Sequence, residues 1–540
     1  MTFRRFSSFG LAALACVLVA AKPGGLAVDQ AAANRVRGHV QFLASDELEG
    51  RDTGSRGHQV AAAYVAAQFA SMGLKPAGTN GSWYQQVPFR KATHARPPQI
   101  GIITKGQSRL AAPGDINLRP SLTQKQRNFE AGLVFVGHGI IEPKYGVNEY
   151  AGVDVRGKIV VVMRGTPKGL PADVAAHLEQ VKDDIALAKG AVGVAELSFA
   201  GGGGRGGGGG GGPGRPITDW IDPAGAVGNT GSRMASIALS ADFSKALFKG
   251  ERRSLDQIGA ARGTKMRAFP LKTRLAINAE SKWDDFTSPQ VVGMIPGADP
   301  RLAHEYVFLM GHLDHLGVKP DAKPGEDAIY NGALDNAAGI ATMLEAARYF
   351  AEAGKPPRRS VIFMANTGEE KGLLGAGYYI AHPTVPARQI VAAVDLDMPL
   401  LLYDFTDIVA FGADHSTVAR TVAQAARGMG ISVGEDPMPE QTIFVRSDHY
   451  QFVRGGVPAI LLFTGYANGG KAKWDEFFAR AYHKPSDDMS QTINWNAGAR
   501  YAKLNYEISR ILADADQRPL WYRGDYFGER FAPGQPRAAP

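Results

Sequence analysis

Five short segments of this sequence place histidine and carboxylate side chains at the ends of predicted strands or the starts of predicted helices. In chain order they are Gly311–Gly317 (GHLDHLG), Asn331–Gly339 (NGALDNAAG), Thr367–Gly375 (TGEEKGLLG), Val394–Met398 (VDLDM) and Ala481–Asp488 (AYHKPSDD). In an open, parallel α/β sheet the carboxyl ends of the strands meet in one crevice. Two histidines and three acids gathered there suit a divalent metal ion, zinc first. The spacing therefore predicts a metal centre.

His312 is the residue around which this prediction is built. It follows the apolar run Tyr306–Met310, which favours a buried strand, and so stands at the carboxyl end of that strand. Asp314, two residues further on, is predicted to orient the imidazole by accepting its second N–H. An isolated His-x-Asp pair is more often a structural hydrogen bond, and it is the downstream motifs that favour chemistry here.

The other motifs each have an ordinary structural alternative. Glu369–Glu370 could be solvated acids at a helix start, where the helix dipole favours them. Asp335 could be a helix N-cap, and His483 could lie on the surface. Asp395 competes with Asp397, because residues two apart in a strand point to the same face. The set favours a functional site because every member stands at an element boundary.

Composition limits the class of protein. The chain has 540 residues, 44% of them apolar and 21% charged, which is typical of a globular protein of two or three domains. The formal charge of +8 is dispersed, without the basic stripe or motif of a nucleic-acid binder, so no nucleic-acid partner is expected. Cys16 is the only cysteine, which excludes thiol catalysis and disulfides in a chain that has lost its first residues.

The first residues have the pattern of a secretory signal peptide. Arg4 and Arg5 precede an apolar run over 10–21, and small residues at 19–21 offer a cleavage site. The run is too short to span a bilayer, so we expect no stable membrane anchor. Residues 1–21 are therefore predicted to direct export, to the periplasm or the exterior.

Periodicity divides the remaining chain into parts. Residues 31–43 and 60–72 have helical spacing. The polar loop 43–57 between them is predicted to be solvated rather than to bind a ligand, although a loop at this position could still line the cleft. From residue 276, strand-like and helical runs alternate, which predicts a mixed, largely parallel sheet flanked by helices. The predicted domains are 30–98 (the N-terminal part of the main domain), 99–275 (an inserted β-rich domain with a glycine-rich loop at 201–214), 276–517 (the catalytic domain) and 518–540 (a Pro- and Arg-rich surface arm).

The five motifs in this order resemble the zinc-dependent exopeptidases that include bacterial leucyl aminopeptidase, aminopeptidase Y and glutamate carboxypeptidase. The resemblance covers about 283–515, and the inserted domain resembles a protease-associated domain. It implies two zinc ions per chain and a peptide substrate. Carried over by motif, the first ion is held by His312, Asp335 and Asp397, and the second by Asp335, Glu370 and His483.

The resemblance also implies the catalytic groups. Glu369 corresponds to a general base outside the coordination sphere, and Tyr482 to a tyrosine that steadies the oxyanion. Arg446–His449 resembles a loop near the cleft whose role stays open. Leu334 replaces an acid common among the relatives, at a position that is not a ligand. The resemblance implies that the protein is an exported zinc metallopeptidase, and the expected reaction is the release of N-terminal residues from peptides.

Three alternatives remain open. A carboxypeptidase or dipeptidase of the same family would need a cationic pocket for the terminal carboxylate. Arg446 is the one arginine in a motif-like loop, and pairing with Asp448 is expected, which favours the aminopeptidase. A single-zinc acyltransferase of the glutaminyl cyclase kind would need only one metal, and a non-catalytic binding protein would lack ligands. The complete set of five ligands argues against both.

Overall fold

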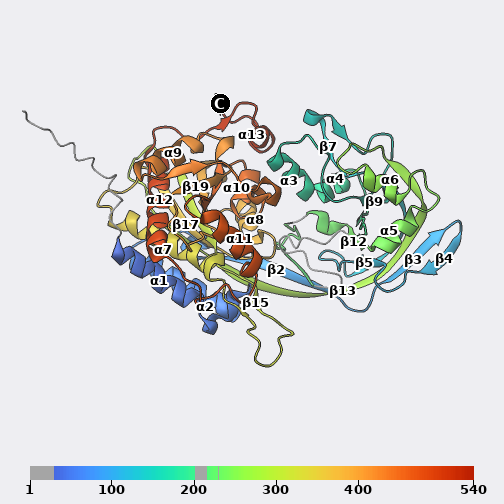
Figure 1. The fold of residues 1–540 in the computed structure, drawn as a ribbon, viewed down its shortest axis with the longest axis horizontal. Helices are drawn as coiled ribbons and strands as arrows, with labels where there is room; N and C mark the ends of the chain where they lie inside the picture. Colours follow the sequence, from blue (N-terminus) through green and yellow to red (C-terminus); the bar gives the residue numbers. More distant parts are fainter. Residues whose placement is uncertain (1–28, 201–215, 229) are drawn as a thin grey trace, which may run out of the picture.

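The computed structural model describes residues 29–200, 216–228 and 230–540. The predicted signal peptide, 1–21, and the glycine-rich run, 201–214, lie outside the described residues. Figure 1 shows two lobes joined by long strands: a larger lobe that contains α1, α7 and α12, and a smaller lobe that contains β3, β9 and α5. None of the described helices has the length and apolar character needed to cross a lipid bilayer.

The strands form two sheets that share one strand, β13 (Phe269–Ile295). The sheet of the large lobe also contains β1 (Lys75–Pro76), β2 (Tyr84–His94), β11 (Ile217–Trp220), β14 (Tyr306–His312), β17 (Ser360–Asn366), β18 (Ile390–Asp395), β19 (Asp407–Phe411), β20 (Ser432–Gly434) and β21 (Ala459–Thr464). The sheet of the small lobe also contains β3 (Gln99–Thr104), β4 (Gln107–Leu110), β5 (Ile116–Leu118), β6 (Gln126–Phe135), β9 (Ile159–Val162), β10 (Gly193–Glu196) and β12 (Ala235–Leu239).

Short strand pairs and helices complete the fold. The pairs are β7 (Ile141–Glu142) with β8 (Val147–Asn148), β15 (Gly317–Val318) with β16 (Ile329–Tyr330), and β22 (Trp521–Tyr522) with β23 (Arg537–Ala538). The helices are α1 (Gln30–Leu43), α2 (Arg56–Ser71), α3 (Ala172–Gln180), α4 (Lys182–Ala188), α5 (Ala241–Leu247), α6 (Leu255–Ala260), α7 (Ala338–Glu352), α8 (Leu374–Ala381), α9 (Val418–Gly428), α10 (His449–Arg454), α11 (Gly470–Arg480), α12 (Trp495–Asp514) and α13 (Tyr526–Phe531).

The centre of the large sheet is parallel, as the sequence predicts. The order β17–β14–β18–β21 is parallel throughout, while β13 and β19 join its two sides in antiparallel fashion. Helices cover both faces. In the register of β14 and β17, Phe308 and Phe363 occupy neighbouring positions and so point to opposite faces. Phe308 packs on Tyr379 of α8, and Phe363 packs on Phe350 of α7.

The boundary predicted at 275/276 is wrong, because it cuts a continuous strand. Residues 274–278 of β13 pair with both β3 and β6 of the small sheet, and residues 291–295 pair with β17 of the large one. In the small lobe, α3 and α4 are consecutive helices separated at Val181. Whether the small lobe is a protease-associated domain stays a prediction.

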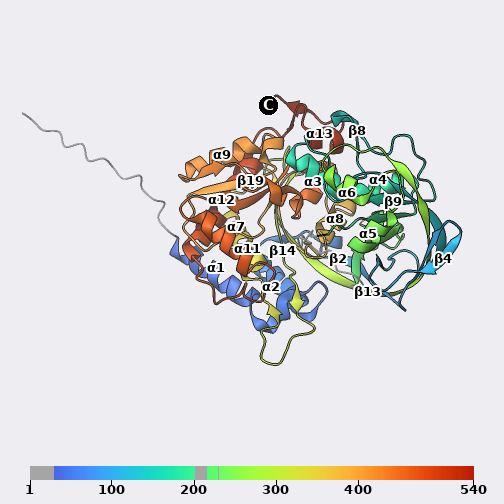
Figure 2. The same ribbon diagram turned by 45° about the vertical axis from the view of Figure 1, so that its right-hand side comes forward.

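The C-terminal arm is more ordered than its composition predicts. Residues 518–540 contain α13 and the β22–β23 pair rather than an extended surface segment. Trp521 is 1% exposed and donates its Nε1–H to the carbonyl of Gly456 over 3.1 Å, and Phe527 is fully buried. In Figures 1 and 2, α13 lies beside α3 of the small lobe. The arm therefore packs against both lobes because it carries buried aromatic side chains.

Candidate metal centre and substrate cavity

Three adjacent parallel strands deliver most of the predicted site residues. His312 ends β14, Glu369 and Glu370 follow β17, and Asp397 follows β18, with β14 between the other two strands. Because parallel strands end at the same edge, these side chains converge. Asp335 joins them from the short π-helical turn Ala333–Ala337 that precedes α7. His483 comes from the loop after α11.

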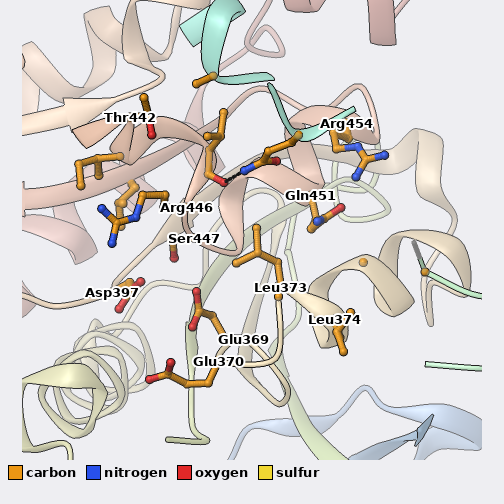
Figure 3. Close-up of a pocket in the computed structure, with 18 of the residues that line it drawn as sticks. Glu369, Glu370, Leu373, Leu374, Asp397, Thr442, Arg446, Ser447, Gln451 and Arg454 are labelled. Carbon is orange, nitrogen blue, oxygen red and sulfur yellow. Dashed lines mark hydrogen bonds between the residues drawn. The ribbon is translucent and has the colours of Figure 1, made fainter. Parts of the chain in front are cut away.

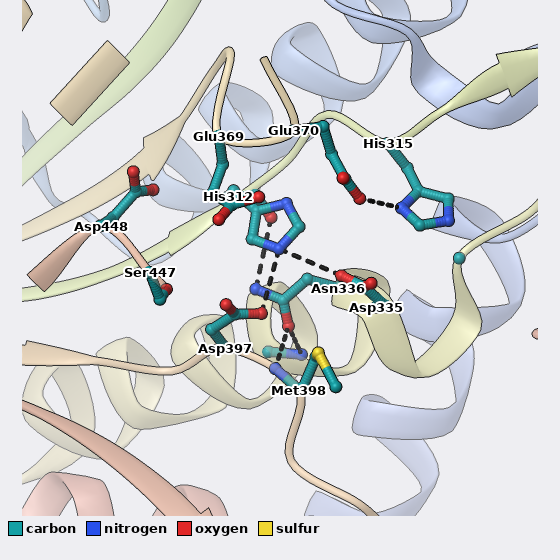
Figure 4. A network of polar contacts seen from close by, with 12 residues as sticks. His312, His315, Asp335, Asn336, Glu369, Glu370, Asp397, Met398, Ser447 and Asp448 are labelled. Atoms are coloured by element: carbon teal, nitrogen blue, oxygen red, sulfur yellow. Dashed lines mark hydrogen bonds and ion pairs between the residues drawn. The ribbon is translucent and has the colours of Figure 1, made fainter. Parts of the chain in front are cut away.

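The five predicted ligands form one chain of contacts centred on Asp335, and Figure 4 labels four of them, all but His483. His312 Nε2 lies 3.0 Å from Asp397 Oδ1 and 3.2 Å from Asp335 Oδ1. His483 Nε2 lies 3.3 Å from Asp335 Oδ2 and 3.4 Å from Glu370 Oε2. The two oxygens of Asp335 therefore face the two histidines. This places Asp335 between two groups of donors that share it.

The donor atoms at this centre fit a cation better than they fit one another. Asp335 Oδ2 and Glu370 Oε1 are buried without a hydrogen bond from any described residue. A buried carboxylate oxygen left unpaired costs free energy, on the order of 1–3 kcal/mol or more. His312, Asp335 and Glu370 each offer a donor atom within 4.8 Å of the others. Converging oxygens and imidazole nitrogens of this kind are the donors that zinc prefers.

His315 is a sixth member of this centre that the sequence analysis missed. Its ring is fully buried, and Nδ1 lies 2.6 Å from Glu370 Oε1 without hydrogen-bond geometry. The oxygens of Glu370 thus face two histidines, His315 and His483. The GHLDHLG motif itself holds the signal, a second histidine three residues after His312.

Two further polar residues fix the loop that carries Asp335. Asn336 accepts from the N–H of Met398 over 3.1 Å and donates to the carbonyl of Leu396 over 3.0 Å, so it ties this loop to both neighbours of Asp397. Asp487 accepts from the N–H of Asp335 over 2.9 Å, and its burial raises its pKa to about 6. Both lie inside the predicted motifs but were given no role there.

Asp314 contacts His312 through a different atom from the predicted one. The main-chain carbonyl of Asp314, not its carboxylate, lies 2.9 Å from His312 Nδ1. The carboxylate instead accepts from the Thr53 hydroxyl over 2.8 Å and from the N–H of Glu369 over 3.2 Å. Asp314 therefore orients the imidazole and also fixes the main chain at Glu369.

The loop over 43–57 is solvated only in part. Arg51 is 1% exposed and donates to the carbonyls of Leu313 over 2.9 Å and Asn331 over 2.7 Å. Burial lowers the pKa of Arg51 to about 10, which leaves it protonated at neutral pH. The loop thus joins the segment after His312 to the segment before Asp335. Its acids Asp46, Glu47 and Glu49 are exposed, whereas Arg51 is buried by its hydrogen bonds to main-chain carbonyls.

A cavity of about 850 Å³ opens beside this centre. Glu369, Glu370 and Asp397 lie near one another in its wall, with Leu373 beside them (Figure 3), and Tyr482 and Leu374 also line it. Residues of α3 and α4 from the small lobe, among them Gln180, close the cavity from the opposite side. The small lobe therefore forms part of the wall around any molecule bound there.

The expected pairing of Arg446 with Asp448 is wrong. Asp448 is fully buried and accepts from the Asn366 side chain over 2.6 Å. Arg446 lines the cavity and donates to the Tyr482 hydroxyl over 3.1 Å. No carboxylate among the described residues forms an ion pair with its guanidinium. One reason for preferring an aminopeptidase over a carboxypeptidase is thereby removed.

Residues 290–509 match the family model described as Peptidase family M28. A probable zinc metalloprotease of Pyrenophora tritici-repentis (strain Pt-1C-BFP) is 26% identical over 248 residues, covering 40% of this chain and 55% of that protein. A probable leucine aminopeptidase 2 of Aspergillus oryzae (strain ATCC 42149 / RIB 40) is 28% identical over 226 residues, covering 39% and 42%. The chain thus spans about half the length of these curated relatives.

The fold also has a solved counterpart. An aminopeptidase from Aneurinibacillus sp. strain AM-1 is similar with a TM-score of 0.51 and 20% sequence identity, over 92% of this chain and 97% of that one. At this identity the similarity establishes the shared fold alone. The aligned region covers 92% of this chain, so the structural similarity includes the small lobe as well as the large one.

Proposed function

We propose that this chain, whose residues 290–509 match the model of Peptidase family M28, is a zinc-dependent exopeptidase that releases N-terminal residues from peptides. The observation that carries the proposal is the position of Asp335, whose two oxygens face His312 and His483. A carboxylate shared between two donor groups suits a pair of metal ions. A peptide is the proposed partner, and nucleic acid is not.

Two zinc ions fit the residues that converge here. His312, Asp335 and Asp397 would hold one, and Asp335, Glu370 and His483 the other. When bound, the ions supply positive charge that activates a water molecule and polarises the scissile carbonyl. The buried oxygens of Asp335 and Glu370 that accept no hydrogen bond from a described residue support this assignment. A single-zinc acyltransferase would leave half of the set without use.

Glu369 is the proposed general base. Its main chain is fixed by Asp314, and its side chain lines the cavity beside Glu370. Burial and the nearby carboxylates of Glu370 and Asp397 hold the pKa of Glu369 well above its ordinary value. A carboxylate placed beside the proposed ions but outside their ligand set can take the proton of the attacking water and deliver it to the leaving amine. Tyr482 is proposed to donate its hydroxyl hydrogen to the oxyanion.

The direction of attack rests on the charges around the cavity. Carboxylates near the metal centre favour a substrate with a free, cationic amino group, and one relative is named a leucine aminopeptidase. Arg446 supports the second candidate, a carboxypeptidase or dipeptidase, because it faces the cavity without an acidic partner among the described residues. Export remains proposed from residues 1–21, with the periplasm or the exterior as destination.

The test compares peptides with free and blocked ends as substrates of the zinc-loaded protein. We expect a peptide with a free N-terminus to lose residues one at a time. N-acetylation should abolish cleavage and C-terminal amidation should leave it intact. The opposite pattern would identify a carboxypeptidase, and loss with either block would identify a dipeptidase. No cleavage of any peptide by protein with two bound zinc ions would contradict the proposed function.

A further inference from the structure

Tyr482 and Arg446 form a polar pair in the wall of the cavity. An Nη2–H of Arg446 donates to the Tyr482 oxygen over 3.1 Å. The tyrosine ring stacks on the ring of His483, with centroids 3.8 Å apart and planes inclined by 26°. Both side chains line the cavity that Glu369 also lines. The pair therefore connects a proposed metal ligand to the space that a substrate would occupy.

The donor inventory of the two side chains determines how the Tyr482 hydroxyl is used. A guanidinium carries only N–H donors and has no lone pair to offer, so the phenol oxygen must be the acceptor in this contact. The Tyr482 hydroxyl carries a single hydrogen, and Arg446 cannot accept it. That hydrogen is left to point away from Arg446. A carbonyl oxygen bound in the cavity is the kind of acceptor it would meet.

Arg446 is held in place without being neutralised. Its Nη1–H donates to the carbonyl of Gln441 over 3.3 Å, and its guanidinium carbon lies 6.0 Å from the centre of the Tyr482 ring. No acid in the described part of the chain forms an ion pair with it. The charge of Arg446 therefore acts on the Tyr482 hydroxyl and on the cavity, and a neutral main-chain carbonyl fixes its direction.

We propose that Arg446 is a positioning residue that holds the Tyr482 hydroxyl with its hydrogen directed at the oxyanion of the tetrahedral intermediate. The inference rests on the proposed peptidase function, in which negative charge develops on the scissile carbonyl beside Tyr482. A donor oriented before the reaction needs no reorganisation as that charge appears. Arg446 touches no reacting atom in this arrangement, and its effect on the rate passes through Tyr482.

A double-mutant cycle tests this dependence. Tyr482→Phe removes the donor and should lower kcat by about 10²–10³-fold, as loss of one oxyanion donor does. Arg446→Met removes the guanidinium but keeps a long side chain, and should lower kcat by about 10–100-fold through misorientation of the hydroxyl. The double variant should be no slower than Tyr482→Phe alone, because the two residues act as one unit. KM and zinc content should stay near wild-type values in all three.

Three further arms make the cycle specific. Arg446→Lys keeps the charge and a donor, so it should recover part of the rate lost in Arg446→Met. The inhibition constant of a peptide phosphonate, a tetrahedral anion, should rise in Arg446→Met by about the factor that kcat/KM falls. Arg480→Met removes an exposed arginine two residues before Tyr482, outside the cavity, and should change neither quantity.

Two results would overturn the proposal. Multiplicative losses in the double variant would mean that Arg446 acts independently of Tyr482. The second is a rise in KM caused by Arg446→Met for substrates with a free C-terminal carboxylate but not for their amides. If the same rise also occurs when Arg446→Met is made in the Tyr482→Phe variant, Arg446 is a direct anchor for that carboxylate. Failure of the proposed function is a separate result, since it would appear as no turnover by the zinc-loaded wild-type protein.

Discussion

Two places in this molecule bring one histidine together with two carboxylates, in opposite arrangements. At the candidate metal centre, Asp335 and Asp397 both approach Nε2 of His312, at 3.2 and 3.0 Å. Where the small lobe meets the C-terminal arm, His415 divides its nitrogens: Nδ1 lies 2.7 Å from Asp525 and Nε2 lies 3.2 Å from Asp173. The two places contain the same residue types, but they differ in how many N–H donors the histidine nitrogen must supply to the carboxylates that face it.

A protonated imidazole has one N–H for each of two acids, so it satisfies the arrangement at His415. Burial lowers the pKa of His415, but the hydrogen bonds to Asp173 and Asp525 outweigh it and raise the pKa to about 9. At His312 a single nitrogen faces two carboxylates, and one proton cannot serve both. Convergence on one point thus marks a cation site, whereas separate pairing marks a structural contact between parts of the fold.

The largest expected effect comes from the shared ligand. Asp335→Asn should remove the negative charge that both histidine groups face, and should weaken zinc binding by more than about 100-fold, the upper range for loss of a supporting partner. Peptidase activity should disappear with the metal. Zinc content after dialysis, measured by elemental analysis, checks this. His415→Gln is the matched control and should retain about two zinc ions; full zinc in Asp335→Asn would contradict the shared-ligand model.

The second prediction compares Glu369, the proposed base, with its neighbour Glu370, a proposed metal ligand. Glu369→Gln should keep both zinc ions and lower kcat by about 10²–10⁴-fold, the usual contribution of a positioned proton acceptor. Glu370→Gln should instead lose zinc, because Glu370 lies against His315 and His483. Parallel zinc analysis and steady-state kinetics check the pair. A near-wild-type rate for Glu369→Gln would reduce that residue to an acid at a helix start.

The contact of His415 with the small lobe and the arm should make the stability of the fold depend on pH. The pKa of His415 is raised from 6.5 to about 9 in the folded protein, so its stabilisation is fully present below pH 6.5 and is lost as pH rises through 9. A shift of this size corresponds to about 3 kcal/mol in the free energy of unfolding. Urea unfolding of wild type and His415→Gln should therefore differ most near pH 6. An equal difference at pH 6 and above pH 9.5 would show that protonation is not involved.

The same contrast explains what the sequence could predict. Apolar runs and their periods predict β14, β17, β18 and α7, because the apolar residues that each element buries are spaced with the period of that element. Of the proposed metal ligands, His312, Glu370 and Asp397 follow from strand ends, which local sequence marks. By contrast, β13 serves two sheets over 27 residues, and no local signal shows where one partner sheet replaces the other.

The residues that were missed are those whose role depends on distant partners. Arg51 donates to carbonyls more than 250 residues away, and Asp487 binds a main-chain N–H 152 residues away. Polar composition alone predicts exposure for both, because it does not identify the partner that makes burial tolerable. Trp521 and Phe527 were hidden in the same way by the prolines and arginines around them. Tertiary contacts, rather than propensity, determine these positions.

The smallest expected effect comes from an exposed pair at the same junction as His415. Lys144 of the small lobe lies 2.7 Å from Glu529 of the arm, with side chains 39% and 50% exposed. Solvent screens such a pair, so Lys144→Gln should change the free energy of unfolding by about 0.5 kcal/mol or less. Urea unfolding at pH 6, beside His415→Gln, checks this. A loss as large as that of His415→Gln would mean that total charge across the junction, rather than burial and paired N–H donors, holds the lobe and the arm together.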